Sequence, residues 1–82
     1  MDRFAVEWLV PAQPDRLIHA MLLDRERPAP HVFAVGHGAD KGHALLNLWA
    51  TLKQNEVVAE AIDYVAAVYT RRTGRAPGES TG

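Results

Sequence analysis

Three segments in the first half of the chain carry the hydrophobic patterns of β-strands. In Phe4–Val10 the two-residue period of a strand puts Phe4, Val6, Trp8 and Val10 on one face and Ala5, Glu7 and Leu9 on the other. Leu17–Leu23 is apolar on both faces, which suits a central strand that is covered on each side. His31–Val35 is a shorter apolar run, and the connections between these segments are short and contain prolines. Short connections favour antiparallel neighbours, so the sequence predicts a three-stranded meander.

The second half of the chain follows the helical period. Asp40 is placed to accept hydrogen bonds from the free amides at the start of a helix that ends near residue 54. Asn55 is the expected cap of a second helix over residues 56–72, and Gly74 suits the position after its last turn. The expected fold is therefore α+β, a three-stranded antiparallel meander followed by two α-helices (βββαα) that pack on one sheet face.

We expect one domain over residues 1–72 and a disordered C-terminal tail over residues 73–82. The 82 residues (9.0 kDa) suffice for one hydrophobic core and not for two. The tail holds three glycines and a proline and no large apolar residue. Burial therefore cannot offset the entropy lost when such a segment becomes ordered.

Composition excludes several classes of protein. The chain has 9 basic and 10 acidic residues, and its net charge of -1 argues against a surface built mainly to bind phosphates. It contains no cysteine, which excludes a disulfide scaffold, thiolate zinc ligands and a cysteine nucleophile. Its longest unbroken apolar run, Tyr64–Tyr69, is far shorter than the about 20 residues of a membrane span. We expect no membrane association and a cytoplasmic location, because the first residues do not resemble a secretion signal.

The second predicted helix is apolar over most of its circumference. Its polar residues form one narrow stripe, whereas a helix that covers a sheet in a monomer needs an apolar stripe of only somewhat over about 100°. Either the helices pack on each other as well as on the sheet, or the additional apolar surface meets a second copy. We expect the second arrangement, as a two-fold homodimer. The candidate interface residues are Trp8, Met21, Ile62, Tyr64 and Tyr69.

A glycine-rich segment joins the last predicted strand to the first helix and is a candidate anion site. Free amides and the helix dipole would point at a ligand held near Gly36, Gly38 and Lys41. The segment lacks the βαβ context of a dinucleotide fingerprint and the Gly-Lys-Ser/Thr ending of a phosphate loop. The alternative is that the chain reversal needs glycine for its backbone angles.

Histidines near the same turn give a candidate metal site. His37, Asp40 and His43 recur at spacings of three, and imidazole with carboxylate suits zinc. No second cluster supplies a fourth ligand, so we expect no cofactor. His19 shares a strand face with apolar neighbours and is interpreted as a partly buried side chain. We expect no enzyme, because the one serine, Ser80, lies in the tail and no paired carboxylates stand in the predicted strands.

The segment Gly36–Ala44 resembles the end of a double-stranded-RNA-binding domain. That family typically reads Gly-x-Gly-x-Ser-Lys-Lys-x-Ala there, after an antiparallel meander. The resemblance implies that Asp40 takes the place of the capping serine and that Lys41 is the first phosphate-contacting lysine. The family's second lysine is Gly42 here and its later helix lysine is Leu45, which removes much of the expected affinity for duplex RNA.

The same region is similar to the HicB-like antitoxin domain, a βββα unit whose helix often begins Gly-Asp-Thr-x-x-x-Ala-Leu-x-Asn. The residues that fit this pattern are Gly38, Ala44, Leu45 and Asn47. The acidic pair that precedes Ala-Leu in that family is Gly42-His43 here. The resemblance implies oligomerisation and a protein partner, typically a small toxin ribonuclease.

We therefore expect a non-enzymatic, homo-oligomerising protein-interaction module that uses the apolar sheet face or the second helix. Two alternatives are kept. One is an RNA-binding module that uses Lys41, the amides near Gly38, and arginines such as Arg25 and Arg27. The other is an antitoxin-type partner of a small ribonuclease.

Overall fold

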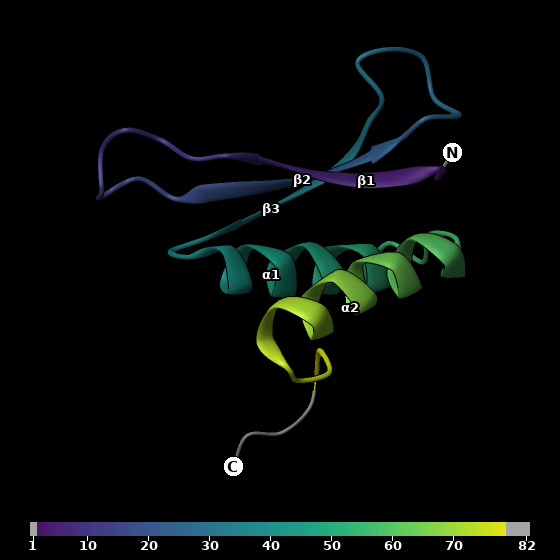
Figure 1. Ribbon diagram of the computed structural model, residues 1–82. Coiled ribbons are helices and arrows are strands. Elements are labelled where there is room, and N and C mark those ends of the chain that lie inside the picture. Colours follow the sequence, from purple (N-terminus) through teal and green to yellow (C-terminus); the bar gives the residue numbers. More distant parts are fainter. Residues whose placement is uncertain (1, 79–82) are drawn as a thin grey trace.

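The computed structural model describes residues 2–78 as an antiparallel sheet with two helices on one side (Figure 1). The strand order is β1-β2-β3, so neighbours in sequence are neighbours in the sheet. The predicted α+β fold and its βββαα order are confirmed. The elements are β1 Phe4–Leu9, β2 Ile18–Asp24, β3 Val32–Gly38, α1 Lys41–Gln54 and α2 Ala59–Thr73.

The hydrophobic core lies between the sheet and the two helices. Alternation along β1 turns Phe4 and Trp8 toward the helices, and the Phe4 ring lies 5.9 Å from that of Tyr64 on α2. Helix α1 packs on β2 and β3, and α2 packs on α1 and touches β1. The largest fully buried side chains are Leu22, Leu45, Leu48, Leu52 and Val65.

Two glycines bring α1 against the backbone of β3. A β-carbon at Gly36 would lie 2.3 Å from the backbone nitrogen of Leu48, and one at Gly38 would lie 2.3 Å from that of Ala44. Strand β3 therefore continues to Gly38, beyond the predicted end at Val35. These glycines do not form the turn expected from the sequence; they remove the side chains that would hold the helix away from the sheet.

The helix ends follow local hydrogen bonding. Asp40 caps α1 as predicted, accepting at Oδ1 from the backbone N–H of His43 at 2.9 Å. The prediction that Asn55 caps the second helix is wrong, because its side chain donates to the carbonyl oxygen of Thr51 and closes α1. Helix α2 starts later, at Ala59, without a side-chain cap. Gly74 ends it with a left-handed φ of 77°, as expected.

The first residues of the tail that was predicted over residues 73–82 lie within the described part of the chain. Thr73 is the last residue of α2, and the chain then turns back so that Gly78 lies beside the Trp49 ring of α1. Pro77 is half-buried. Residues 79–82 of the predicted tail lie outside the described residues.

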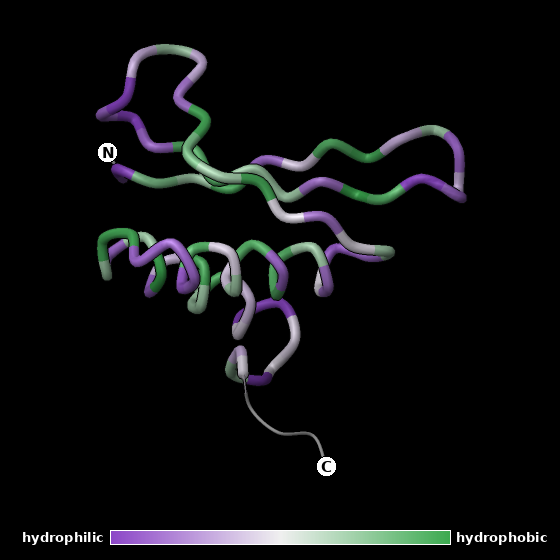
Figure 2. The backbone as a smooth tube through the Cα atoms, turned by 180° about the vertical axis from the view of Figure 1, so that it is seen from behind, coloured by the Kyte–Doolittle hydropathy of each residue, from purple (hydrophilic) through white to green (hydrophobic). Residues whose placement is uncertain are grey.

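Among residues 2–78, no helix lies on the other face of the sheet (Figure 1). Both faces of the middle strand are apolar, as the sequence indicates, but the two helices cover only one of them. Figure 2 shows hydrophobic stretches along the strands of this layer. Within residues 2–78, neither helix combines the length and the apolar character needed to cross a membrane.

Candidate functional site

The three residues of the predicted anion site do not line one hollow: Gly36 borders a hollow of about 410 Å³ beside Asn47 and Thr51, and neither Gly38 nor Lys41 lines it. Gly36 and Gly38 are buried beneath α1 and pair with Ala20 and Ile18 in the β2–β3 ladder. The backbones of these two glycines therefore pair with β2 and pack against α1. Lys41, at the start of α1, places its ammonium 5.3 Å from the centre of the Trp8 ring, a cation–π distance.

The structure brings together two of the three predicted metal ligands. The His43 imidazole Nδ1 lies 2.8 Å from Asp40 Oδ2, and the same carboxylate caps the helix. These hydrogen bonds lower the pKa of Asp40, and the one donated by the His43 backbone N–H has the largest effect. His37 is not part of this pair, because strand alternation turns it to the face opposite the buried Gly36 and Gly38. Among residues 2–78, no three histidine, aspartate or glutamate side chains gather to hold a metal ion.

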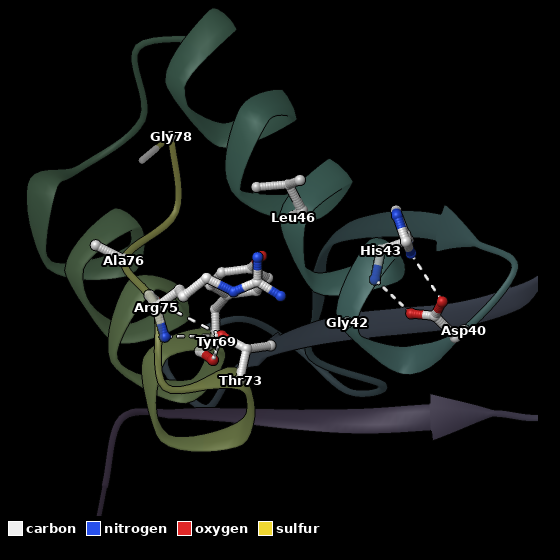
Figure 3. Close-up of a pocket in the computed structure, with 9 residues that line it drawn as sticks. All are labelled: Asp40, Gly42, His43, Leu46, Tyr69, Thr73, Arg75, Ala76 and Gly78. Atoms are coloured by element: carbon white, nitrogen blue, oxygen red, sulfur yellow. Dashed lines mark hydrogen bonds and ion pairs between the residues drawn. The ribbon is translucent and has the colours of Figure 1, made fainter. Parts of the chain in front are cut away.

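The Asp40–His43 pair borders a groove of about 500 Å³ between the start of α1 and the end of α2 (Figure 3). Arg75 and Tyr69 line its other side. The Asp40 carboxylate holds the His43 imidazole at the edge of the groove through Nδ1. The Thr73 hydroxyl already donates a hydrogen bond to the Tyr69 carbonyl oxygen at 2.8 Å. The groove thus presents a polar pair and a cation without an activated nucleophile.

The predicted interface residues separate into two groups. Four of them pack against the core of the same chain: Trp8, Ile62, Tyr64 and Tyr69. The apolar flank of α2 is therefore used largely within one copy. Met21 is different, because it lies at the centre of the sheet face that no helix covers, opposite Glu7 on β1 and Val35 on β3.

Among residues 2–78, neither helix covers this open face of the sheet. We define it by nine positions in register across the sheet, namely Ala5, Glu7, Leu9, His19, Met21, Leu23, Val32, Val35 and His37. A β-bulge in β3 keeps the apolar residue Val32 on the open face, because it turns both Phe33 and Ala34 toward the core. Leu9 and Val32 are 54% and 40% exposed, and neighbouring Leu17 is 52% exposed. Leu9 and Val32 stand at opposite corners of this face, with Met21 between them.

Two pairs of residues in the structure were not expected from the sequence. Arg3 donates from Nε and Nη2 to the two carboxylate oxygens of Asp24, at 3.0 and 3.2 Å, and Asp24 is only 2% exposed. This double hydrogen bond holds the pKa of Asp24 below its usual value. His19 and His37 form the second pair, with ring centres 4.3 Å apart on the open face. Both pairs join positions distant in sequence, so only the strand register could have indicated them.

Comparison with family models, curated proteins and solved structures gave no match. The resemblances to the double-stranded-RNA-binding and HicB-like domains therefore stay predictions, as do homodimerisation and the cytoplasmic location.

Proposed function

We propose that this protein is an interaction module that self-associates through the open face of its sheet. The observation that carries the proposal is an uncovered, contiguous apolar surface with Met21 at its centre. Six of its nine positions are apolar, and the helices bury the other side of the same sheet. Two such faces packed together would form a sandwich core about 10 Å thick.

The apolar residues on both sides of β2 favour a second copy as the occupant: Ala5 and Leu9 lie on β1, and Val32 and Val35 on β3. A two-fold axis along β2 lays β1 of one copy over β3 of the other. Met21 then faces Met21 of the partner, and Ala5 of each copy faces Val32 of the other. The contact is self-complementary, as a two-fold interface requires.

The size of the face predicts a weak dimer. Three strands about 4.8 Å apart and six or seven residues long span roughly 300 Å² of flat sheet. Stable complexes bury about 800 Å² per partner, so this contact belongs to the small class even when Leu17 extends it. We therefore expect weak, reversible association that depends on protein concentration.

Sedimentation equilibrium over a range of protein concentrations tests the proposal. We expect reversible dimers of the wild type and monomers of Met21→Asp, because the substitution places a charge at the centre of the face. Val58→Asp is the matched control, since Val58 is 49% exposed but lies outside the open face at the start of α2. It should still dimerise. A wild type that stays monomeric at the highest concentration, or a Met21→Asp protein that is folded and dimeric, overturns the proposal.

Nucleic-acid binding is the second candidate, and one cluster supports it. Lys41 and Arg72 both lie 5.3 Å from the centre of the Trp8 ring, and Arg71 borders the same hollow. Cations beside an aromatic ring can pair with phosphates while a base stacks. Titration with duplex and single-stranded RNA at two salt concentrations tests this candidate. No binding at low salt excludes it.

A further inference from the structure

His19 and His37 form a side-by-side pair in the open face. They are direct partners in the antiparallel register of β2 and β3, and their rings meet edge to face at 4.3 Å. Within residues 2–78, neither ring is hydrogen-bonded to another side chain, whereas the His43 ring is held by Asp40. Leu9 flanks the pair on β1. Two imidazoles on neighbouring strands thus stand together on an apolar surface.

Paired imidazoles suit a divalent transition metal. Neutral imidazole nitrogen is a common ligand for zinc, nickel and copper ions, and two cross-strand rings can chelate one ion after small side-chain rotations. A hollow of about 450 Å³ beside the pair is also lined by Asp15 and Arg16, so one carboxylate and one cation face it. A zinc ion takes four ligands in a structural site. Because no three ligands gather within residues 2–78, one copy offers only half of such a site.

A second copy on the open face would supply the other half. A two-fold axis along β2 brings His19 of one copy opposite His19 of its partner, with His37 of each copy on either side. Glu7 of both copies lies one row away on the same face and would add negative charge near the ion. We infer that the dimer binds one zinc-class divalent ion between its two sheets, through His19 and His37 of both copies. This inference rests on the proposed dimer.

Calorimetric titration of the untagged, chelator-treated full chain with Zn²⁺ tests the inference, together with sedimentation equilibrium with and without the ion. We expect one ion per two chains and a dimer dissociation constant lowered by at least about tenfold. His19→Ala and His37→Ala should each abolish this effect of zinc. His43→Ala is the matched control, because it removes the imidazole of the other polar pair and should leave the zinc effect intact.

The outcomes separate the inference from the proposed function. A dimer that forms equally in chelator and in zinc overturns the metal site and leaves the dimer in place. A monomer under both conditions overturns both. One ion per monomeric chain, or zinc binding that is lost in His43→Ala and kept in His19→Ala, also overturns the shared site. Circular dichroism of each variant shows whether it is folded before it is compared.

Discussion

Replacing Gly36 with alanine should separate α1 from the sheet. The new β-carbon would stand 2.3 Å from the Leu48 backbone nitrogen and 2.5 Å from the Ala44 carbonyl oxygen, and both atoms belong to the helix backbone. Neither can rotate away, so α1 must move outward by roughly 1 Å to restore ordinary contact. A gap of this size forfeits about a quarter to a half of the dispersion energy of each contact that Leu45 and Leu48 make with the sheet.

We expect the Gly36→Ala substitution to lower the free energy of unfolding by about 3 kcal/mol, the upper part of the range for overpacked cores. A domain of this size has a total stability of about 4–12 kcal/mol, so the loss is a large share. The melting temperature should fall by about 12–24 °C. Urea unfolding followed by circular dichroism measures the change through the transition midpoint.

Gly42→Ala is the matched control for this substitution. Gly42 lies in the first turn of α1, where a β-carbon would meet only side-chain atoms, Asp40 Oδ1 at 3.3 Å and Thr73 Cγ2 at 3.7 Å. Alanine is the better helix former, but the Asp40 Oδ1 cap must shift by a few tenths of an ångström, so stability should change by less than about 1 kcal/mol in either direction. A Gly36→Ala protein that loses less than about 1 kcal/mol would refute the close packing of α1 on β3.

Three further substitutions test the carboxylates of Asp24 and Asp40. The pKa of Asp24 is depressed in the folded state by Arg3, so its contribution to stability is complete above the ordinary pKa of about 3.9 and is lost as the pH falls through the folded value. Asp24→Asn should therefore be less stable than the wild type at pH 7, with a smaller difference at pH 3; equal differences in urea midpoint would contradict this. Asp40→Ala should lower the melting temperature by removing the acceptor for the His43 N–H, whereas Asp40→Asn, which can still accept, should lose less. Equal losses in thermal scans would show that the cap is not what stabilises α1.

Local patterns predicted most of the fold. The two-residue period placed Phe4 and Trp8 on the covered face, and the Asp40 cap located the start of α1. The prediction for Asn55 was wrong because the same side chain can cap a following helix or close a preceding one, and sequence spacing does not distinguish the two. Gly36 was assigned to a turn because the approach of a helix to a strand is a tertiary contact.

The candidate site was less predictable than the fold. Trp8 and Tyr69 were expected at an interface because apolar residues that pack within one chain and between chains have the same sequence pattern. Met21 lies on the open face because the covering helices reach only one side of the sheet. His37 was grouped with Asp40 by spacing, although the alternation of β3 directs its ring to His19. Pairing of that kind depends on the register, which the bulge shifts by one residue.

The bulge beside Phe33 has a consequence for how this chain can vary. The extra residue shifts the alternation of β3 by one position, so that Val32 faces away from the helices while Ala34 and Gly36 lie on the side of α1. A residue added to the connection between β2 and β3, residues 25–31, can therefore be absorbed at this irregular step without rotating Gly36 away from the helix. We expect an insertion in that connection to cost less stability than one between Ala34 and Gly38.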